Sequence, residues 1–395
     1  MQLPERKKIL NKNQHVVEKR VAQSDSGMKA VVTAIVEEHG ESDEPQQPNS
    51  KSKTQPPLSI VITNFNGGDA LLDTVAACLQ TKLEDIEVIV VDDGSTDDSV
   101  ARVQKAFSQV RIVALGRNTR RLNVVRNAGI KAASHDYVML MDNDITFSPD
   151  VFPRLLEVLV SRPDAAAASP RLQYSDASHA IYWDGGKLHY LGASVCTNRG
   201  APPETSPRSP ERNIGCGNVM LDRTKLAEIG YFDEDYWLGW ADDGEIYYRL
   251  LAAGYECLHV SDVSGFHIAK TRTTERLGAQ LHNRWMFMFK NYQVRTILLS
   301  LPVLVVFEFM QAGFCILKGA GRDYFKSLGS VFRELPHIIK DRHRVVRKRV
   351  RSDKEILTTG PLYIASEHIN KPMYWLLYGS QVVFNGYWEL MRHLL

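Results

Sequence analysis

The sequence predicts an α/β fold, with a mostly parallel sheet flanked by helices and a helical region towards the C-terminal end. From residue 58 to residue 146, short apolar runs of strand length alternate with segments of helical periodicity. Such alternation favours right-handed βαβ crossovers and therefore parallel strands. Beyond residue 295 the composition changes to a long apolar run and then a basic segment. We therefore expect a disordered tail over 1–56, an α/β domain over 57–295 and a helical region over 296–395.

The composition excludes several classes of protein. Lys and Arg number 48 against 46 Asp and Glu, so the overall charge does not favour a polyanion as partner. The five cysteines are scattered without a Cys-x-x-Cys pair, which argues against a disulfide framework or a zinc knuckle and fits a reducing compartment. No apolar run follows the basic start, so we expect no cleaved signal peptide. The tail is rich in Pro, Ser and Gln, and within it we expect a short helix at most over Met28–Glu38.

The α/β part begins with a strand over Leu58–Thr63, which a turn at Asn64–Gly68 follows. Asp69 is placed to cap the next helix, Ala70–Gln80, whose apolar positions repeat at helical spacing. The later expected elements are a strand over Ile86–Val91, a helix over Asp98–Phe107, a strand over Arg111–Leu115 and a helix over Ala128–Ala133.

The next apolar run, Tyr137–Met141, has the length of a strand buried on both faces, and it ends in Asp142-Asn143-Asp144. Carboxylates also follow the second strand, at Asp92-Asp93, so polar clusters end several strands at one edge of the sheet. Two carboxylates so close together repel each other, and Mg²⁺ or Mn²⁺ with substrate phosphates is their natural partner. Turn sequences of this kind also occur without any ligand, so Asp97 and Asp98 remain open to a purely capping role.

These segments, taken with four others, resemble a family 2 glycosyltransferase of the GT-A fold, of the kind that builds bacterial cell-surface polysaccharide or transfers rhamnose. The four others are Arg126–Gly129, Gly215–Asn218, Gly230–Glu234 and Asp242–Arg249. The resemblance covers residues 58 to 295. Neither a G-x-G-x-x-G after the first strand nor a P-loop motif is present, which argues against dinucleotide dehydrogenases and P-loop enzymes.

The resemblance implies roles for individual residues on the donor side. Thr63 and Asp93 match positions that hold the nucleotide base, and Asn66 and Arg126 match positions that line the nucleotide pocket. Asp142 matches the carboxylate near the ribose, Asp144 the metal ligand, and His267 a histidine that completes the metal or diphosphate site. A divalent ion there would neutralise the charge of the leaving diphosphate.

On the acceptor side the resemblance implies that Asp243 is the general base of an inverting transfer. Trp240, Asp242 and Glu245 are assigned to acceptor binding and support of that base. Where the family usually has Glu-Asp and then Asp, this chain has Asp242-Asp243 and then Glu245. These residues also read as the acidic first turn of a helix, and the two interpretations are compatible.

Further expectations concern a loop near the site, one cysteine and a long apolar segment. Pro202–Arg212 lacks periodicity and is expected to be a mobile loop over the site, and Cys216 is expected to be a packing residue. Thr296–Leu317 is long enough to cross a bilayer, although Glu308 makes a lone lipid-facing span costly.

Lys318–Lys354 carries twelve Lys and Arg against four Asp and Glu, which indicates an anchor to anionic lipid, with Lys340–Arg351 as its core. The run lacks a nucleic-acid-binding module, so we expect no nucleic acid as partner. The aromatic residues of 373–390 predict an amphipathic helix at the membrane interface.

The sequence therefore predicts a metal-assisted, inverting glycosyltransferase at the cytoplasmic side of a membrane. It would pass sugar from a UDP- or dTDP-sugar to a hydroxyl of a glycan or lipid-linked acceptor. Two alternatives stay open: a nucleotidyltransferase, which would give no reason for Asp242-Asp243, and a catalytically silent nucleotide-sugar-binding protein anchored to the membrane.

Overall fold

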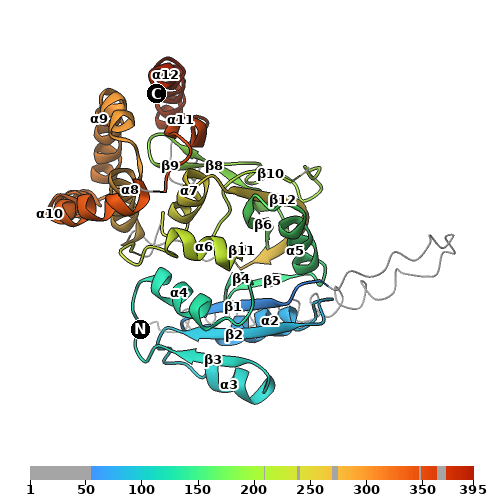
Figure 1. Cartoon of the computed structure of the whole chain (residues 1–395). Helices are drawn as coiled ribbons and strands as arrows, with labels where there is room; N and C mark the ends of the chain where they lie inside the picture. The colour runs from blue at the N-terminus through green and yellow to red at the C-terminus, as the bar shows by residue number, and fades with distance from the viewer. Residues whose placement is uncertain (1–54, 209, 238–240, 269–274, 347, 363–370) are drawn as a thin grey trace, which may run out of the picture. The chain divides into compact units, whose positions relative to one another are not determined.

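The computed structural model describes residues 55–395, apart from 209, 238–240, 269–274, 347 and 363–370 (Figure 1). The predicted tail, apart from its last two residues, and the short helix Met28–Glu38 lie outside the described residues. The predicted acceptor residue Trp240 lies outside them as well. Residues Gln55–Leu395 form one compact unit.

A mixed sheet forms the centre of this unit, with strands in the order β10-β12-β6-β11-β4-β1-β2-β3. Its parallel half consists of β1 (Leu58–Asn64), β2 (Ile86–Asp92), β3 (Arg111–Ala114) and β4 (Tyr137–Asp142). The other half consists of β11 (Val219–Asp222), β6 (Ala165–Tyr174), β12 (Glu256–His267) and β10 (Glu211–Arg212), of which β11 and β10 run antiparallel to their neighbours. The predicted, mostly parallel α/β sheet is confirmed.

The register of the parallel strands brings their polar ends level. Thr63 of β1 lies opposite Asp142 of β4 and opposite Val91 of β2. Asn64 lies opposite Asp92 at the next position. Strands β1, β2 and β4 are largely apolar and buried, whereas the edge strand β3 is partly exposed. The buried strands fix the sheet, and polar side chains stand at its carboxyl edge.

Shorter strands extend the sheet and form a second one. Within the main sheet β5 (Ile145–Phe147) pairs with β12, and β7 (Ile181–Trp183) pairs with β6. A separate sheet has the order β13-β8-β9, with β13 (Leu357–Thr358), β8 (Gly186–His189) and β9 (Ala193–Cys196).

The helices of the α/β part are α2 (Gly68–Cys78), α3 (Ser99–Ala106), α4 (Leu122–Ala132), α5 (Val151–Ser161), α6 (Arg223–Ile229) and α7 (Gly244–Ala252). Two predictions about them are wrong. Asp69 lies inside the first turn of α2 and does not cap it; its carboxylate instead pairs with Arg102 at 2.6 Å. The helix predicted from Ala128 begins six residues earlier, so Arg126 lies inside α4.

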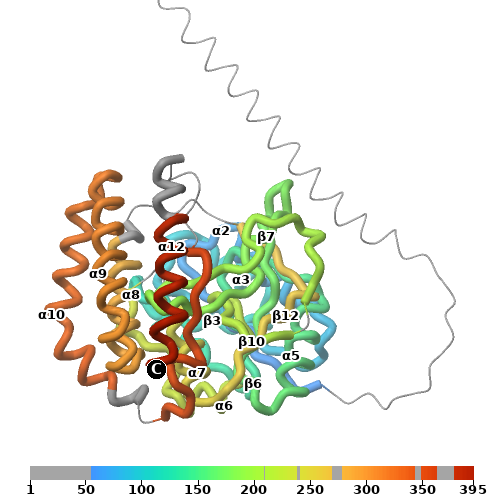
Figure 2. The backbone as a smooth tube through the Cα atoms, turned by 90° about the horizontal axis from the view of Figure 1, so that it is seen from above, coloured from blue at the N-terminus to red at the C-terminus, as the bar shows by residue number. Residues whose placement is uncertain are grey.

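The C-terminal part contains α8 (Glu275–Asn291), α9 (Val294–Leu317), α10 (Gly321–Val346), α11 (Asp353–Ile356), α12 (Lys371–Met391) and a 3-10 turn over Arg392–Leu394. The predicted apolar helix is confirmed as α9, which by length and composition alone qualifies as a membrane span. Figure 2 shows α9 and α10 as neighbouring rods at one side, with α12 beyond α9. Because α8 packs along α10, the helical layer already begins before residue 295.

The basic run Lys340–Arg351 was predicted to attract anionic lipid. Two of its residues, Arg349 and Arg351, instead pair with groups of the protein. Arg349 is largely buried and donates to Tyr248 Oη at 2.8 Å and to Asp353 Oδ1 at 2.8 Å. Arg351 donates to Glu256 Oε1 at 2.5 Å. These guanidinium groups fasten the C-terminal part to α7 and β12, so they do not serve as free charges for anionic lipid.

The aromatic prediction for 373–390 is also wrong in part. Phe384 and Trp388 of α12 are buried, and the Trp388 ring stacks on Tyr190 with 5.0 Å between ring centroids. Tyr190 Oη donates to the Phe384 carbonyl at 2.9 Å. These rings face the protein, whereas Tyr378 is exposed.

Candidate active site

Two adjacent carboxylates after β2 have different environments. Asp92 accepts from Asn64 Nδ2 at 2.9 Å and from Ser95 Oγ at 2.5 Å, so it holds the turn together. Asp93 is buried, and its Oδ1 accepts from the Thr119 N–H at 2.9 Å. Thr63 donates from Oγ1 to the Met141 carbonyl at 3.3 Å. The structure thus sets the predicted base-binding pair, Thr63 and Asp93, at the ends of neighbouring strands.

Asn66 adopts a left-handed conformation, with φ of 50°, which Asn tolerates better than most residues. Its side-chain oxygen accepts from the Thr96 N–H at 2.7 Å and from the Asp97 N–H at 3.3 Å. Asn66 therefore joins the turn after β1 to the turn after β2 and is itself exposed. Its predicted place in the nucleotide pocket stays a prediction.

Asp142 ends β4 and is held by Asn218, a residue to which sequence analysis gave no role. The Asp142 N–H donates to Asn218 Oδ1 at 2.9 Å, and Asn218 Nδ2 donates to Asp142 Oδ2 at 3.1 Å. The antiparallel pairing of β11 with β4 brings the two residues together across 76 positions of sequence. The sequence motif Gly215–Asn218 indicated a functional segment here. That Asn218 contacts Asp142 could be known only from the pairing of β11 with β4.

Arg126 is the one basic residue in a group of acids. Its buried guanidinium lies 3.0 Å from Asn123 Oδ1 and 3.5 Å from Asp242 Oδ2, and 5.5 Å from the centre of the Phe232 ring. Burial alone would lower the pKa of Arg126, but the carboxylates of Asp242 and Asp142 outweigh burial and raise it. The structure therefore brings Arg126 and Asp142, both predicted donor-side residues, together with the predicted acceptor-side pair.

Glycine at position 217 permits this close packing. A Cβ at Gly217 would lie 2.3 Å from Arg126 Nη2, and one at Gly215 would lie 2.3 Å from Tyr247 Oη. Tyr247 Oη itself donates to the Cys216 carbonyl at 2.7 Å. Burial raises the pKa of the Cys216 thiol to about 12, which fits the prediction that Cys216 packs and does not act as a nucleophile.

Asp242 and Asp243 stand at the start of α7, where Asp243 is the N-cap residue. Burial and then repulsion by Asp243 raise the pKa of Asp242 to about 8. Burial also raises the pKa of Asp243, while Arg126 opposes that rise. A carboxylate whose pKa is raised towards neutrality is a better proton acceptor than an ordinary one, provided that it is ionised when substrate binds.

Glu245 lies in the first turn of α7 and faces Arg249, whose Nε is 2.6 Å from Glu245 Oε1. Burial raises the pKa of Glu245, although Arg249 opposes this. Arg249 also donates to the carbonyls of Ile229 and Tyr231. Glu245 thereby ties α7 to the end of α6, and its predicted role towards the acceptor stays a prediction.

Asp144 and His267, the predicted metal residues, are neighbours. The pairing of β5 with β12 places them so, and the Ile268 N–H donates to the Asp144 carbonyl at 3.0 Å. Asp144 Oδ1 lies 3.6 Å from His267 Nε2, and both side chains are mostly buried. Adjacent ligands of an octahedral Mg²⁺ or Mn²⁺ lie about 3 Å apart, so a small closing movement would let one ion take both. The two residues therefore fit a divalent ion whose remaining positions are filled by phosphate and water.

Asp184, which follows β7, is the centre of a buried ion-pair cluster. Asp184 is fully buried and accepts from Arg171 Nε at 2.9 Å, from Arg208 Nη1 at 3.0 Å and from Asn198 Nδ2 at 2.7 Å, and it lies 2.9 Å from His259 Nε2. Burial would raise the pKa of Asp184, but these partners lower it well below its usual range. Arg208 of the loop Pro202–Arg212 is thus held by Asp184, and the predicted mobility of the loop stays a prediction.

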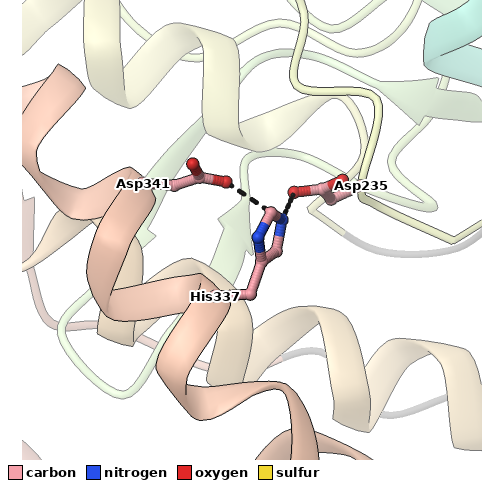
Figure 3. A group of neighbouring side chains, drawn as sticks. All are labelled: Asp235, His337 and Asp341. Atoms are coloured by element: carbon pink, nitrogen blue, oxygen red, sulfur yellow. Dashed lines mark hydrogen bonds and ion pairs between the residues drawn. The ribbon is translucent and has the colours of Figure 1, made fainter.

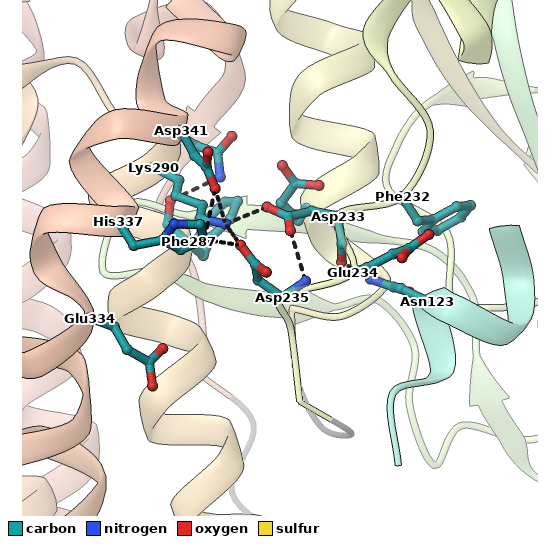
Figure 4. Close-up of polar contacts among 12 residues, drawn as sticks. Asn123, Phe232, Asp233, Glu234, Asp235, Phe287, Lys290, Glu334, His337 and Asp341 are labelled. Carbon is teal, nitrogen blue, oxygen red and sulfur yellow. Dashed lines mark hydrogen bonds and ion pairs between the residues drawn. The ribbon is translucent and has the colours of Figure 1, made fainter. Parts of the chain in front are cut away.

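The segment that leads to Asp242 and Asp243 is held from both sides. On one side Asn123 Nδ2 of α4 donates to the Asp233 carbonyl at 2.8 Å. On the other, Lys290 Nζ of α8 lies 2.7 Å from carboxylate oxygens of both Asp233 and Asp235 (Figure 4). Asn283 of α8 accepts from the Trp237 N–H at 3.1 Å and donates to its carbonyl at 2.7 Å.

Residues of α10 extend the same network. His337 Nε2 lies 2.9 Å from Asp235 Oδ2 and 3.2 Å from Asp341 Oδ2 (Figure 3). These three side chains offer ligand atoms within 4.8 Å of one another. Lys290 Nζ lies 3.4 Å from Asp341 and is itself buried, so an ammonium group already supplies positive charge at this place. We therefore assign the group to structure.

Comparison with known proteins agrees with this arrangement. Residues 59–209, which include the nucleotide edge of the sheet and the Asp142–Asp144 motif, match the glycosyl transferase family 2. This stretch of the chain is therefore similar to that family.

The names of curated proteins that are similar to this chain describe bacterial polysaccharide synthesis. Chondroitin synthase of Escherichia coli is 28% identical over 236 residues, which cover 53% of this chain and 34% of that protein. The succinoglycan biosynthesis protein ExoO of Rhizobium meliloti (strain 1021) is 36% identical over 160 residues, 40% of this chain and 43% of that protein. The chain spans 34%, 23% and 24% of the first three curated relatives, two of which are synthases of Pasteurella multocida.

One relative is matched over nearly all of its length. The UDP-Glc:alpha-D-GlcNAc-diphosphoundecaprenol beta-1,3-glucosyltransferase WfaP of Escherichia coli is 25% identical over 249 residues, 59% of this chain and 91% of that protein. Among solved structures, GalNAc-T7 with UDP, GalNAc and Mn²⁺ superposes with a TM-score of 0.52 at 16% identity, over 64% of this chain and 52% of the other. At this identity the match establishes the GT-A fold.

Proposed function

We propose that this chain transfers a sugar from a UDP- or dTDP-sugar to a hydroxyl of a glycan or lipid-linked acceptor, with inversion, in bacterial polysaccharide synthesis. One observation carries the proposal: Asp142, Arg126, Asp242 and Asp243 gather where the carboxyl end of β4 meets the start of α7. The groups that we assign to the donor and to the acceptor thus lie together, which supports a transfer between them. The names of the polysaccharide relatives support the same reading.

In the proposed reaction Thr63 and Asp93 hold the nucleotide base, and Asp142, oriented by Asn218, receives the ribose. Asp243 takes the proton of the acceptor hydroxyl as that oxygen bonds to the anomeric carbon. The bond from the anomeric carbon to the diphosphate breaks on the opposite face, and the nucleoside diphosphate leaves. Asp144 and His267 would hold a divalent ion, which supplies positive charge for the leaving diphosphate.

Arg126 has a separate task in this scheme. With Asp142, Asp242 and Asp243 around it, the buried guanidinium limits their mutual repulsion before substrate arrives. Asp242 accordingly supports the charge state of Asp243, because each carboxylate affects the protonation of the other.

We further propose that the reaction takes place at the cytoplasmic face of a membrane. Nucleotide sugars are made in the cytoplasm, and α9 gives the chain an apolar helix of membrane length. The name of WfaP specifies a diphosphoundecaprenol acceptor for that relative, and a lipid-linked acceptor of that kind suits a chain held beside a bilayer.

The proposal is tested by incubating the purified full chain with a panel of UDP- and dTDP-sugars and a lipid-linked glycan acceptor, with Mn²⁺ or with excess chelator. We expect one donor to release nucleoside diphosphate in step with product, and the chelator to abolish it. Donor binding without release from any member of the panel would favour the silent binding protein. Release of pyrophosphate from a nucleoside triphosphate would favour nucleotidyl transfer.

A further inference from the structure

The outer face of α9 carries an apolar stripe along the length of the helix. Its members lie on one side of the helix and each is at least 42% exposed: Leu298, Leu301, Val305, Val306, Phe309 and Leu317. A continuous exposed stripe of this size marks an interaction surface in a soluble unit. Within α9, the one carboxylate is Glu308, and its side chain is mostly buried.

The other face of α9 is attached to the rest of the unit. Thr296, Ser300, Val303 and Leu304 are buried, and Tyr387 of α12 donates to the Leu299 carbonyl at 2.7 Å. Glu308 pairs with Arg284 of α8, and Tyr324 of α10 donates to Glu308 Oε2 at 2.6 Å. Helices α8, α10 and α12 therefore pack against α9 from its first turn to beyond its middle.

The neighbouring helix α10 carries cations among exposed apolar residues. Arg322, Lys326, Arg333 and Lys340 are exposed, and Phe325, Phe332 and Ile339 lie between them in sequence with more than half of each side chain exposed. These positions recur at helical spacing and so form one stripe about 27 Å long. Cations with bulky apolar residues on one helix face are typical of helices that lie on anionic bilayers.

These contacts exclude a simple transmembrane crossing by α9. If α9 stood across the bilayer, its partner pair Arg284–Glu308 would lie near the midplane, together with the part of α8 that carries Arg284. The exposed Arg322 and Lys326 of α10 would also enter the hydrocarbon. Charged groups at that depth are strongly disfavoured. With α9 parallel to the membrane surface, the apolar stripe enters the lipid while all of these charges stay at the interface or in water.

We propose that α9 and α10 dock side-on to an anionic phospholipid surface, without crossing it. This rests on the membrane location in the proposed function and adds the surface and the orientation. The charge of the α10 stripe selects the partner: among the exposed charged residues of its described part, 321–342, Arg322, Lys326, Arg333 and Lys340 outnumber Asp323 four to one. A second copy of the chain would meet the same cations and be repelled at this stripe.

The first test is sedimentation of the full chain with vesicles of phosphatidylglycerol and phosphatidylcholine at low salt. We expect wild-type protein to pellet with the anionic vesicles, and the double variant Lys326→Glu/Arg333→Glu to bind at least about tenfold more weakly, since each cation near such a surface contributes roughly fivefold. The matched control Lys82→Glu/Lys105→Glu changes the same charge on exposed lysines of the α/β part and should bind as wild type. An equal loss of vesicle binding in both double variants would overturn the proposal. So would a wild-type chain that does not bind the vesicles and elutes as a dimer in gel filtration.

The second test decides the orientation. Arg295→Cys and Lys318→Cys place an exposed thiol at either end of α9. In sealed inside-out membrane vesicles from an expressing bacterium, side-on docking predicts that a membrane-impermeant maleimide labels both positions from the cytoplasmic side. Protection of one of them until the membrane is permeabilised would show that α9 crosses. Vesicle binding and labelling are read without any sugar transfer, so failure of the proposed reaction would leave both results interpretable.

Discussion

The Arg126 guanidinium lies 3.5 Å from the Asp242 carboxylate, and both side chains are buried. Arg126 comes from α4, on the nucleotide side, and Asp242 precedes α7, on the acceptor side. The pair is thus a direct electrostatic connection between the two halves of the proposed reaction. It also sets the charge of Asp243, because the three groups affect one another's protonation.

This connection predicts an unusual pH profile. Burial raises the pKa of Asp243, so kcat/KM should rise with pH through a value above the usual carboxylate range. Burial and then the charge of Asp243 raise the pKa of Asp242 to about 8, so Asp242 is still protonated while Asp243 ionises. Asp242→Asn should therefore leave the acid limb in place. Steady-state kinetics between pH 4 and pH 9 check this, and a limb that moves by more than about one pH unit in the variant would contradict it. Asp69→Asn, at the surface, is the control.

Gly217 should be intolerant of even one added methyl group. In Gly217→Ala the Cβ would lie 2.3 Å from Arg126 Nη2, so Arg126 must move away from Asp142 and Asp242. We expect donor affinity and transfer to fall by about tenfold or more, equivalent to roughly 1.4 kcal/mol, with the fold retained. Gly329→Ala, where a Cβ meets no atom within 4 Å, is the matched control. Unchanged nucleotide affinity in Gly217→Ala would argue against Arg126 as a pocket residue.

Lys290 should be important for the stability of the fold and for the position of the segment around Asp233 and Asp235, which precedes Asp242 and Asp243. Lys290→Met would leave Asp233 and Asp235 without their buried cation, and loss of one partner of a buried pair costs about 3–5 kcal/mol. Urea unfolding measures this, and Lys290→Arg should recover part of the loss. Arg102→Met breaks an exposed pair with Asp69 and should change the unfolding free energy far less. A small effect at Lys290 would show that the network does not hold the segment.

Asp144 should be required for the metal and dispensable for the fold. Asp144→Asn keeps the shape of a side chain at the edge of the sheet but removes its charge, so metal-dependent turnover should fall by about 10²-fold or more. Titration of Mn²⁺ into both proteins, with nucleoside diphosphate present, should show weaker ion binding by the variant, while circular dichroism should be unchanged. Wild-type turnover in excess chelator would remove the basis for a metal at Asp144 and His267.

The strands of the parallel half could be predicted closely from sequence because their apolar runs are continuous and end in polar clusters. Tyr137–Met141 was predicted, and β4 ends one residue later, at Asp142. The start of α4 was missed because its buried face carries Asn123, Arg126 and Asn127 beside the apolar residues Val125 and Ile130. Asn123 and Asn127 are both buried, and they donate hydrogen bonds to the carbonyls of Asp233 and Phe232, respectively, more than a hundred residues away.

Cations were the least predictable part of the site and its surroundings. Arg349 and Lys340 lie in one basic run, yet Arg349 is buried against Tyr248 and Asp353 while Lys340 is exposed. A run of charge in the sequence carries no information about such distant partners. Asn218 was missed as a partner of Asp142 for the same reason, since the pairing of β11 with β4 brings them together.

The assignment of Asp243 as the base that activates the acceptor is the central claim, and one comparison tests it most directly. Calorimetry with UDP and dTDP and a transfer assay are run on wild type and Asp243→Asn in the same buffer with Mn²⁺. We predict that the variant binds the nucleoside diphosphate as wild type does and transfers sugar about 10²–10⁴-fold more slowly. Transfer at the wild-type rate, or loss of nucleotide binding before any loss of transfer, would contradict it.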